Sequence, residues 1–167
     1  LVNNFAASST SHVEETRPNS EYRSLHIADG SGLSLYNYVS AELLTKLLRH
    51  AWRTPSIYKA LSEALPIAGV DGTLKKRMIN TPAQGNVRAK TGTLTGITSL
   101  AGYCTAPDGH QLCFAIINQG ILGNTPGRAF QDRVCKVLCG DTEVIGAKEV
   151  RVAKVAKKAN TAKKHQN

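Results

Sequence analysis

Three short segments with strand-like composition occupy residues 86–118, and they restrict the fold of this chain most. Strands are expected from Asn86 to Leu94, from Ile97 to Thr105 and from Gln111 to Asn118. The sequence Pro107-Asp108-Gly109 separates the last two. It is typical of a tight turn, because proline presets its backbone angle and glycine tolerates positive φ. Two strands joined in this way form an antiparallel hairpin, so an antiparallel sheet is predicted.

Helices are predicted before and after these strands. Ser40 is a suitable N-cap for a first helix, and Pro55 suits the first turn of a second, which runs to about Leu65. A third helix ends near Gly140, and its apolar stripe consists of Phe130, Val134, Val137 and Leu138. Trp52 is expected to take part in the core or in helix packing. We therefore predict an α/β fold in which helices cover the faces of an antiparallel sheet.

The 167 residues suffice for one domain with a hydrophobic core, and the net charge of +9 is unevenly spread. Residues 148–167 hold 7 basic against 1 acidic residue, so this short segment carries +6 of the total. We expect an irregular N-terminal remnant over 1–27, a folded portion over 28–146 and a basic mobile tail over 147–167. No apolar run is long enough for a membrane helix, no signal peptide is visible, and no nucleic acid is expected as a partner.

The four cysteines show no metal-binding pattern. They are Cys104, Cys113, Cys135 and Cys139, without a C-x-x-C pair and without histidines at zinc-ligand spacing. We interpret them as small buried apolar side chains. A disulfide between Cys104 and Cys113 stays open, if the two face each other across the hairpin. Neither a metal site nor a cofactor is expected.

The sequence Lys90-Thr91-Gly92-Thr93 is the strongest candidate for a site, and it lies within the first predicted strand. A lysine beside threonines on an edge strand can hold a substrate carboxylate through charge and hydroxyl hydrogen bonds. The small Gly92 allows a substrate backbone to lie close to the strand. A peptide can then add to the sheet edge as an extra strand.

Longer segments place this triplet in a context. They are Ala28-Asp29-Gly30-Ser31-Gly32-Leu33-Ser34-Leu35-Tyr36-Asn37, Leu65-Pro66-Ile67-Ala68-Gly69-Val70-Asp71-Gly72-Thr73-Leu74, Gly85-Asn86-Val87-Arg88-Ala89-Lys90-Thr91-Gly92-Thr93-Leu94 and Ser99-Leu100-Ala101-Gly102-Tyr103. In this order they resemble the D-Ala-D-Ala carboxypeptidase/endopeptidase family of low-molecular-mass class C penicillin-binding proteins. The resemblance covers residues 25–140 and is to the C-terminal part of that family.

The resemblance implies a serine hydrolase of the β-lactamase/transpeptidase-like fold that is incomplete at its N-terminal side. It implies cleavage of peptidoglycan stem peptides through an acyl-enzyme, acylation by β-lactams, and a location in the periplasm or cell envelope. Three motifs form such a site: S-x-x-K, S-x-N and K-T-G. By this resemblance Lys90 and Thr91 bind the carboxylate side of the substrate, Thr93 supplies an oxyanion N–H, and Gly92 completes the strand.

The other two motifs depart from the family pattern. Val2-Asn3-Asn4 occupies the S-x-N register, so Asn4 is the tentative asparagine, whereas Val2 has no hydroxyl to relay a proton. The match Ser56-Ile57-Tyr58-Lys59 lies between the other motifs, in the wrong order. We expect Ser56 to open a helix and Lys59 to face solvent. The nucleophile is therefore expected in a segment before residue 1.

Three functions remain open at this stage. The first is a serine-type D-Ala-D-Ala carboxypeptidase or endopeptidase read from an incomplete chain, which alone is inactive. The second is a catalytically inactive remnant that at most binds peptidoglycan peptides. The third is a basic protein that binds anionic polymers through residues 148–167.

Overall fold

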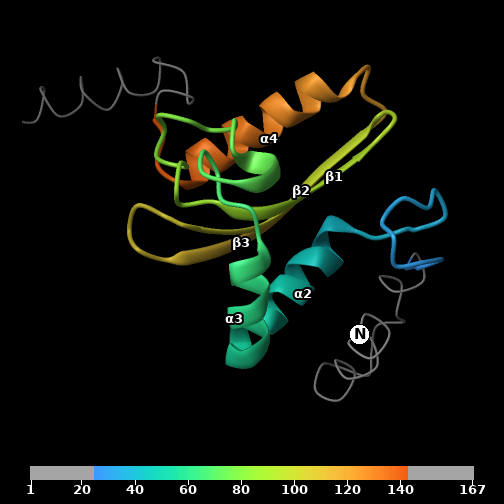
Figure 1. Ribbon diagram of the computed structural model, residues 1–167, viewed down its shortest axis with the longest axis horizontal. Coiled ribbons are helices and arrows are strands. Elements are labelled where there is room, and N and C mark those ends of the chain that lie inside the picture. The colour runs from blue at the N-terminus through green and yellow to red at the C-terminus, as the bar shows by residue number, and fades with distance from the viewer. Residues whose placement is uncertain (1–24, 143–167) are drawn as a thin grey trace, which may run out of the picture.

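The computed structural model describes residues 25–142, which form a three-stranded antiparallel sheet with helices on both faces (Figure 1). The strands are β1 (Arg88–Leu94), β2 (Ile97–Thr105) and β3 (Gln111–Gln119), in the order β1-β2-β3. The predicted strands and the hairpin are confirmed. The turn between β2 and β3 closes with a hydrogen bond from Ala106 N to His110 O, and Gly109 has a φ of 88°.

The first strand begins two residues later than predicted, because the side chain of Asn86 replaces a strand pairing. Its Nδ2 donates to the carbonyl oxygen of Thr105 at 2.9 Å, and its Oδ1 accepts from the Thr105 N–H at 2.7 Å. The amide thus satisfies the end of β2 as a backbone partner would.

The helices are α2 (Ala41–Arg53), α3 (Pro55–Ala64) and α4 (Asn124–Leu138), with a short 3₁₀ turn, η2 (Gly72–Leu74). The hydroxyl of Ser40 accepts from Leu43 N at 3.1 Å, which confirms the predicted N-cap. Pro55 occupies the first turn of α3, as predicted. No helix of residues 25–142 is long and apolar enough to cross a membrane.

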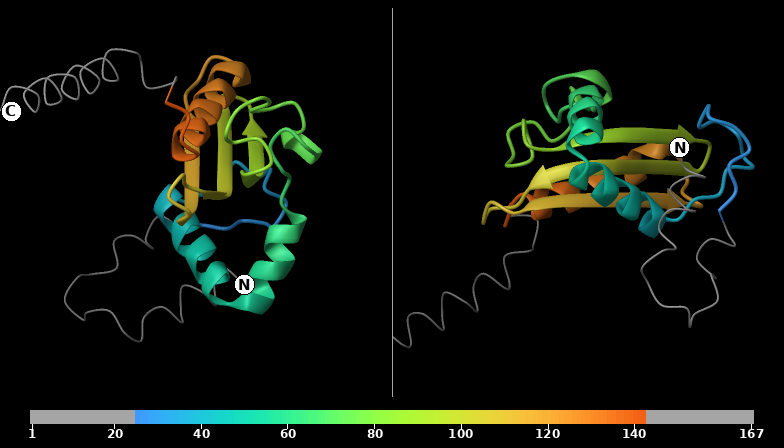
Figure 2. Two further views of the ribbon diagram at one scale, coloured as in Figure 1. Left: turned by 90° about the vertical axis from the view of Figure 1, so that its left-hand side faces the viewer. Right: turned by 90° about the horizontal axis from the view of Figure 1, so that it is seen from below.

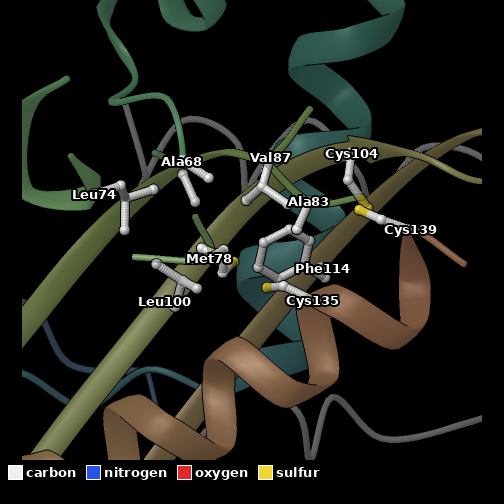
Figure 3. Close-up of a cluster of buried hydrophobic side chains, with 11 residues drawn as sticks. Ala68, Leu74, Met78, Ala83, Val87, Leu100, Cys104, Phe114, Cys135 and Cys139 are labelled. Carbon is white, nitrogen blue, oxygen red and sulfur yellow. The ribbon is translucent and has the colours of Figure 1, made fainter. Parts of the chain in front are cut away.

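In the structure α4 lies on one face of the sheet and α2 on the other (Figure 2). A hydrophobic cluster holds the layers together on each face. The larger lies between the sheet, α4 and the loop before β1, and it contains Leu74, Val87 and Leu100, each 0% exposed (Figure 3). The smaller joins α2 to the other face through Leu48, Leu65 and Tyr103. The Tyr103 hydroxyl donates to the carbonyl oxygen of Leu48 at 2.8 Å.

The predicted apolar stripe of α4 is wrong in part. Phe130 and Val137 are 44% and 37% exposed, whereas the buried residues of the helix are Gly127, Gln131 and Cys135. The helix meets the sheet through a glycine that permits close approach and a glutamine that hydrogen-bonds to strand residues, features that an apolar pattern does not register. Trp52 is 50% exposed and therefore does not belong to the core, one of the two places expected for it.

The register of the hairpin decides the fate of the cysteines. Cys104 pairs with Leu112, and Cys113 pairs with Tyr103, so the two thiols occupy adjacent pairs and point to opposite faces of the sheet. The possible Cys104–Cys113 disulfide is therefore wrong. Cys104, Cys135 and Cys139 are buried in the larger cluster (Figure 3), which confirms their interpretation as small core side chains.

Two expectations from the sequence, the S-x-N register at Val2–Asn4 and the basic tail, fall outside the described part of the chain. Residues 1–24, including Val2 and Asn4, and residues 143–167, including the basic tail, lie outside the described residues. The boundary at 146–147 lies outside the described residues too, and the boundary at 27–28 also stays a prediction.

Candidate functional site

The predicted site residues form one continuous stretch of β1, at an edge of the sheet. Lys90, Thr91, Gly92 and Thr93 pair in register with Ala101, Leu100, Ser99 and Thr98 of β2. Within residues 25–142, β1 has no partner strand on its other side. A strand in this position can pair with a peptide.

The hydrogen bonds at the start of β1 fix which backbone groups face the outer edge. Ala68 N donates to Val87 O and Ala89 N donates to Pro66 O, so the odd-numbered residues direct their polar groups away from β2. Because this direction alternates along an antiparallel strand, the N–H and C=O groups of Thr91 and Thr93 also point outward. The edge thus presents two N–H donors, and that of Thr93 is the group predicted for the oxyanion.

The ammonium group of Lys90 lies at this same edge. The side chain is exposed. It projects from the face of the sheet that α2 covers, as does the side chain of its register partner Ala101. It bends toward the edge, where Nζ donates to the carbonyl oxygen of Thr91 at 2.6 Å. A positive charge therefore lies beside the outward-facing backbone groups, as a carboxylate-binding strand requires.

Gly92 leaves room for the side chain of its register partner on β2. A Cβ atom at this position would overlap the hydroxyl oxygen of Ser99. Because glycine has no side chain, nothing projects from the strand at this position next to Lys90. This agrees with the predicted close approach of a substrate backbone.

A hydroxyl that the sequence interpretation missed lies beside Thr91. The Oγ1 atoms of Thr91 and Thr73 are 3.1 Å apart, which places η2 against the site strand. Asp71 holds the preceding turn, since its Oδ1 accepts from Ile67 N at 2.7 Å. Thr73 lies in the family-like segment from Leu65 to Leu74. The contact with Thr91 shows that this segment reaches the site strand.

A second missed residue lies beside Thr93, on the face of the sheet opposite to the side chain of Lys90. A guanidinium nitrogen of Arg128, in the second turn of α4, donates to Thr93 Oγ1 at 3.4 Å. No motif contains Arg128, and 35 residues separate it from Thr93. Only the fold brings them together, so the sequence holds no local signal for this contact.

The glycine-rich turn around Asp29 is an exposed local structure. Asp29 Oδ1 accepts from the N–H and the hydroxyl of Ser31 at 3.0 and 2.9 Å, and from Asn37 Nδ2 at 3.3 Å. These hydrogen bonds, first that of the Ser31 hydroxyl, hold the pKa of Asp29 below its ordinary value. All of these contacts lie within residues 29–37.

The S-x-x-K match is placed as the sequence predicted. Ser56 and Lys59 lie in the first half of α3, and both side chains are exposed. Ser56 therefore opens a helix and Lys59 faces solvent. Within residues 25–142, no group of three or more His, Cys, Asp or Glu side chains is arranged to hold a metal ion.

A comparison with protein families decides the relationship that this strand suggests. Residues 11–139 match the model of the D-Ala-D-Ala carboxypeptidase 3 (S13) family. The chain belongs to this family. The match includes all three strands, β1 with its K-T-G triplet, β2 and β3, and the whole of α4.

Individual members of the family show the same similarity. The D-alanyl-D-alanine carboxypeptidase of an Actinomadura species is 44% identical over 115 residues, which are 66% of this chain and 21% of the relative. The DacB carboxypeptidase of Haemophilus influenzae is 41% identical over 90 residues, 53% of this chain and 19% of the relative. The chain thus spans about a fifth of the length of these relatives.

Solved structures agree with the family and extend the likeness of fold. The crystal structure of penicillin binding protein 4 from Haemophilus influenzae matches with a TM-score of 0.55 and 39% identity, covering 60% of this chain and 22% of that one. An extended-spectrum β-lactamase matches with a TM-score of 0.51 over 86% of this chain and 52% of its own, at 15% identity. The predicted fold class, an antiparallel sheet flanked by helices as in β-lactamase-like serine hydrolases, is confirmed.

Proposed function

We propose that this chain provides the substrate-binding strand of a serine-type D-Ala-D-Ala carboxypeptidase that acts on peptidoglycan stem peptides through an acyl-enzyme. The observation that carries the proposal is the position of Lys90 Nζ at the open edge of β1, 2.6 Å from Thr91 O. There the ammonium lies beside the outward N–H groups of Thr91 and Thr93. A charge and two backbone donors on one edge suit a peptide that ends in a carboxylate.

In this proposal the peptide lies antiparallel to β1 as an added strand. Lys90 and the hydroxyl of Thr91 hold the terminal carboxylate, and Thr93 N–H donates to the scissile carbonyl oxygen as it becomes an oxyanion. A serine and a lysine from a segment outside residues 25–142 supply nucleophile and base. The serine displaces D-alanine to form the acyl-enzyme, and water then releases the shortened peptide. If the bond cleaved at this site lies in a crosslink between two stem peptides, the same reaction is an endopeptidase reaction.

β-Lactams are proposed as inhibitors that acylate the same serine. One structure of the Haemophilus influenzae protein that matches this chain holds a β-lactam, at 39% identity and a TM-score of 0.54. Since the proposed substrate is part of the cell wall, we also propose the periplasm or cell envelope as the location.

The rival proposal is an inactive remnant that binds peptidoglycan peptides at most. It is supported by the position of Ser56 and Lys59, which are exposed on α3 and not part of the β1 site. No other S-x-x-K match is found in the sequence of the described residues. The two proposals share the binding strand and differ only in the covalent step.

Binding is tested by titrating the ¹⁵N-labelled chain with acetyl-D-Ala-D-Ala and, for comparison, with acetyl-L-Ala-L-Ala. We expect the amide signals of Thr91 and Thr93 to shift with the D-isomer. Lys90→Ala should weaken its binding about tenfold, because a charge-assisted hydrogen bond is lost. Lys59→Ala, which removes an exposed lysine of α3, is the matched control and should change nothing. Equal binding of both isomers, or binding that ignores Lys90→Ala, would refute the proposed site.

Catalysis is tested separately, by joining the chain to the N-terminal portion of the Actinomadura relative. The fusion should release D-alanine from a stem-peptide mimic and become acylated by a fluorescent penicillin. A folded fusion that binds the D-isomer but forms no acyl-enzyme would favour the inactive remnant.

A further inference from the structure

The first turns of α4 pack against β2 through a glycine. Gly127 is buried, and a Cβ atom there would overlap the Thr98 hydroxyl and lie 2.6 Å from a methyl carbon of Ile121. Thr98 is the register partner of Thr93. The residue after Gly127 is therefore carried to the part of β1 that bears the site.

A buried polar network fixes the helix in this position. Gln131, which is 0% exposed, donates from Nε2 to Thr98 Oγ1 at 3.2 Å and to Asn118 Oδ1 at 3.1 Å. Arg77, from the loop before β1, forms a 2.7 Å ion pair with Asp132. The same guanidinium donates to Gln131 Oε1 at 3.2 Å.

Arg77 also holds the backbone of Arg128 itself. One of its nitrogens donates to the Arg128 carbonyl oxygen at 3.3 Å. The Cα of Arg128 is thus anchored, while its own side chain is exposed and donates to Thr93 Oγ1 at 3.4 Å. The acidic side chain four residues later, Asp132, is engaged by Arg77.

Lys90 and Arg128 therefore reach the same stretch of β1 from opposite faces of the sheet. Lys90 contacts the backbone of Thr91 at the edge, and Arg128 contacts the hydroxyl of Thr93. Since Thr93 Oγ1 accepts a hydrogen bond from Arg128, its hydroxyl hydrogen stays available to donate to a substrate oxygen. The second cation adds to the positive potential that an anionic group meets at this edge.

We propose that Arg128 is a positioning residue that orients the Thr93 hydroxyl and, together with Lys90, makes the site select peptides with a free C-terminal carboxylate. The inference rests on the proposed function, since it assigns a specificity to the same edge. It adds a residue outside the three motifs.

The test compares the binding of acetyl-D-Ala-D-Ala with that of its C-terminal amide to the 167-residue chain, followed by ¹⁵N NMR. Arg128→Gln should weaken binding of the acid about three- to tenfold and leave binding of the amide unchanged. The reason is that only the acid carries the negative charge that the Arg128 guanidinium attracts. Arg128→Lys should keep most of the preference for the acid. Arg133→Gln, at an exposed arginine of the same helix whose guanidinium lies 6.0 Å from the Phe130 ring centroid, is the control and should behave like the unmodified chain.

The outcomes separate this inference from the proposed function. If Lys90→Ala weakens binding of the acid and Arg128→Gln leaves the acid-to-amide ratio unchanged, the role of Arg128 is refuted and the site stands. If Arg128→Gln weakens acid and amide equally, Arg128 has a structural role only, and the inference is again refuted. If the unmodified chain shows no preference for the acid, the proposed function and the inference fail together.

Discussion

The ammonium nitrogen of Lys90 lies 2.6 Å from the carbonyl oxygen of Thr91, the next residue along the same strand. This contact keeps the charge at the sheet edge, where it contacts a neutral acceptor. A substrate carboxylate is a stronger acceptor than a carbonyl oxygen and can replace it. The strand thus holds a donor in place for an anion.

Removal of this charge should impair the covalent reaction of the fusion that carries the Actinomadura nucleophile segment. We expect Lys90→Ala to lower the second-order rate constant for acylation by penicillin by about tenfold or more. The measurement is the time course of labelling by a fluorescent penicillin. Lys59→Ala serves as the control, and an unchanged rate for Lys90→Ala would remove this lysine from the site.

The stability of the chain should fall at high pH because of Tyr103. Burial, first, and then the nearby Tyr58 raise the pKa of Tyr103 to about 12, while its unfolded value is about 10. Its contribution is complete below pH 10 and is lost as the pH rises from 10 to 12, because only the unfolded chain then releases the proton.

The free energy of unfolding should therefore drop by about 1 kcal/mol per pH unit in this window relative to Tyr103→Phe. Urea titrations of both proteins at several pH values measure the difference. Below pH 10 the variant should be less stable by about 1 kcal/mol, since the hydrogen bond to Leu48 O is missing. Parallel pH profiles for the two proteins would show that Tyr103 ionises equally in the folded and unfolded states.

The buried amide of Gln131 should be a main determinant of how α4 attaches to the sheet. Gln131→Ala removes the hydrogen bonds that the amide makes with Thr98, Asn118 and Arg77, so we expect a loss of about 1–3 kcal/mol in the free energy of unfolding. Chemical denaturation measures it. Arg133→Ala, at an exposed position of α4, should change the value by less than about 0.5 kcal/mol. A loss no larger than that control for Gln131→Ala would contradict the account of the network.

The basic segment over 147–167 should be dispensable for folding. It carries much of the net charge of +9 and few large apolar residues, so it has little surface to bury. A chain ending at Gly146 should melt at the temperature of the intact protein. A decrease of more than about 4 °C would show that the segment docks onto the folded part, since this corresponds to roughly 1 kcal/mol.

Local sequence signals predicted the elements of this fold well, and they failed where distant residues meet. The cap at Ser40, the proline at the start of α3 and the Pro107-Asp108-Gly109 turn act on their own neighbours, and each is found as predicted. The packing face of α4 was misjudged, because Gly127 and Gln131 contact the sheet through shape and hydrogen bonds rather than through apolar area.

The candidate site divides in the same way. Lys90 to Thr93 are contiguous, so the motif located them, and the pairing of β1 then explained which backbone groups face outward. Thr73 and Arg128 reach the strand from 18 and 35 residues away along the chain, and only tertiary structure reveals them. The question of a Cys104–Cys113 disulfide, which the sequence left open, also needed the register, since one step in register places a side chain on the other face.

The most direct test of the central claim is treatment of residues 1–167 with a fluorescent penicillin, followed by denaturation and electrophoresis. In the proposed function this chain supplies a strand that binds and donates through Lys90, Thr91 and Thr93, and another segment supplies the nucleophile. We therefore expect no label that survives denaturation and no release of D-alanine from a stem-peptide mimic. Covalent labelling of the chain would contradict this proposal, and loss of that label in Ser56→Ala would identify Ser56 as the nucleophile.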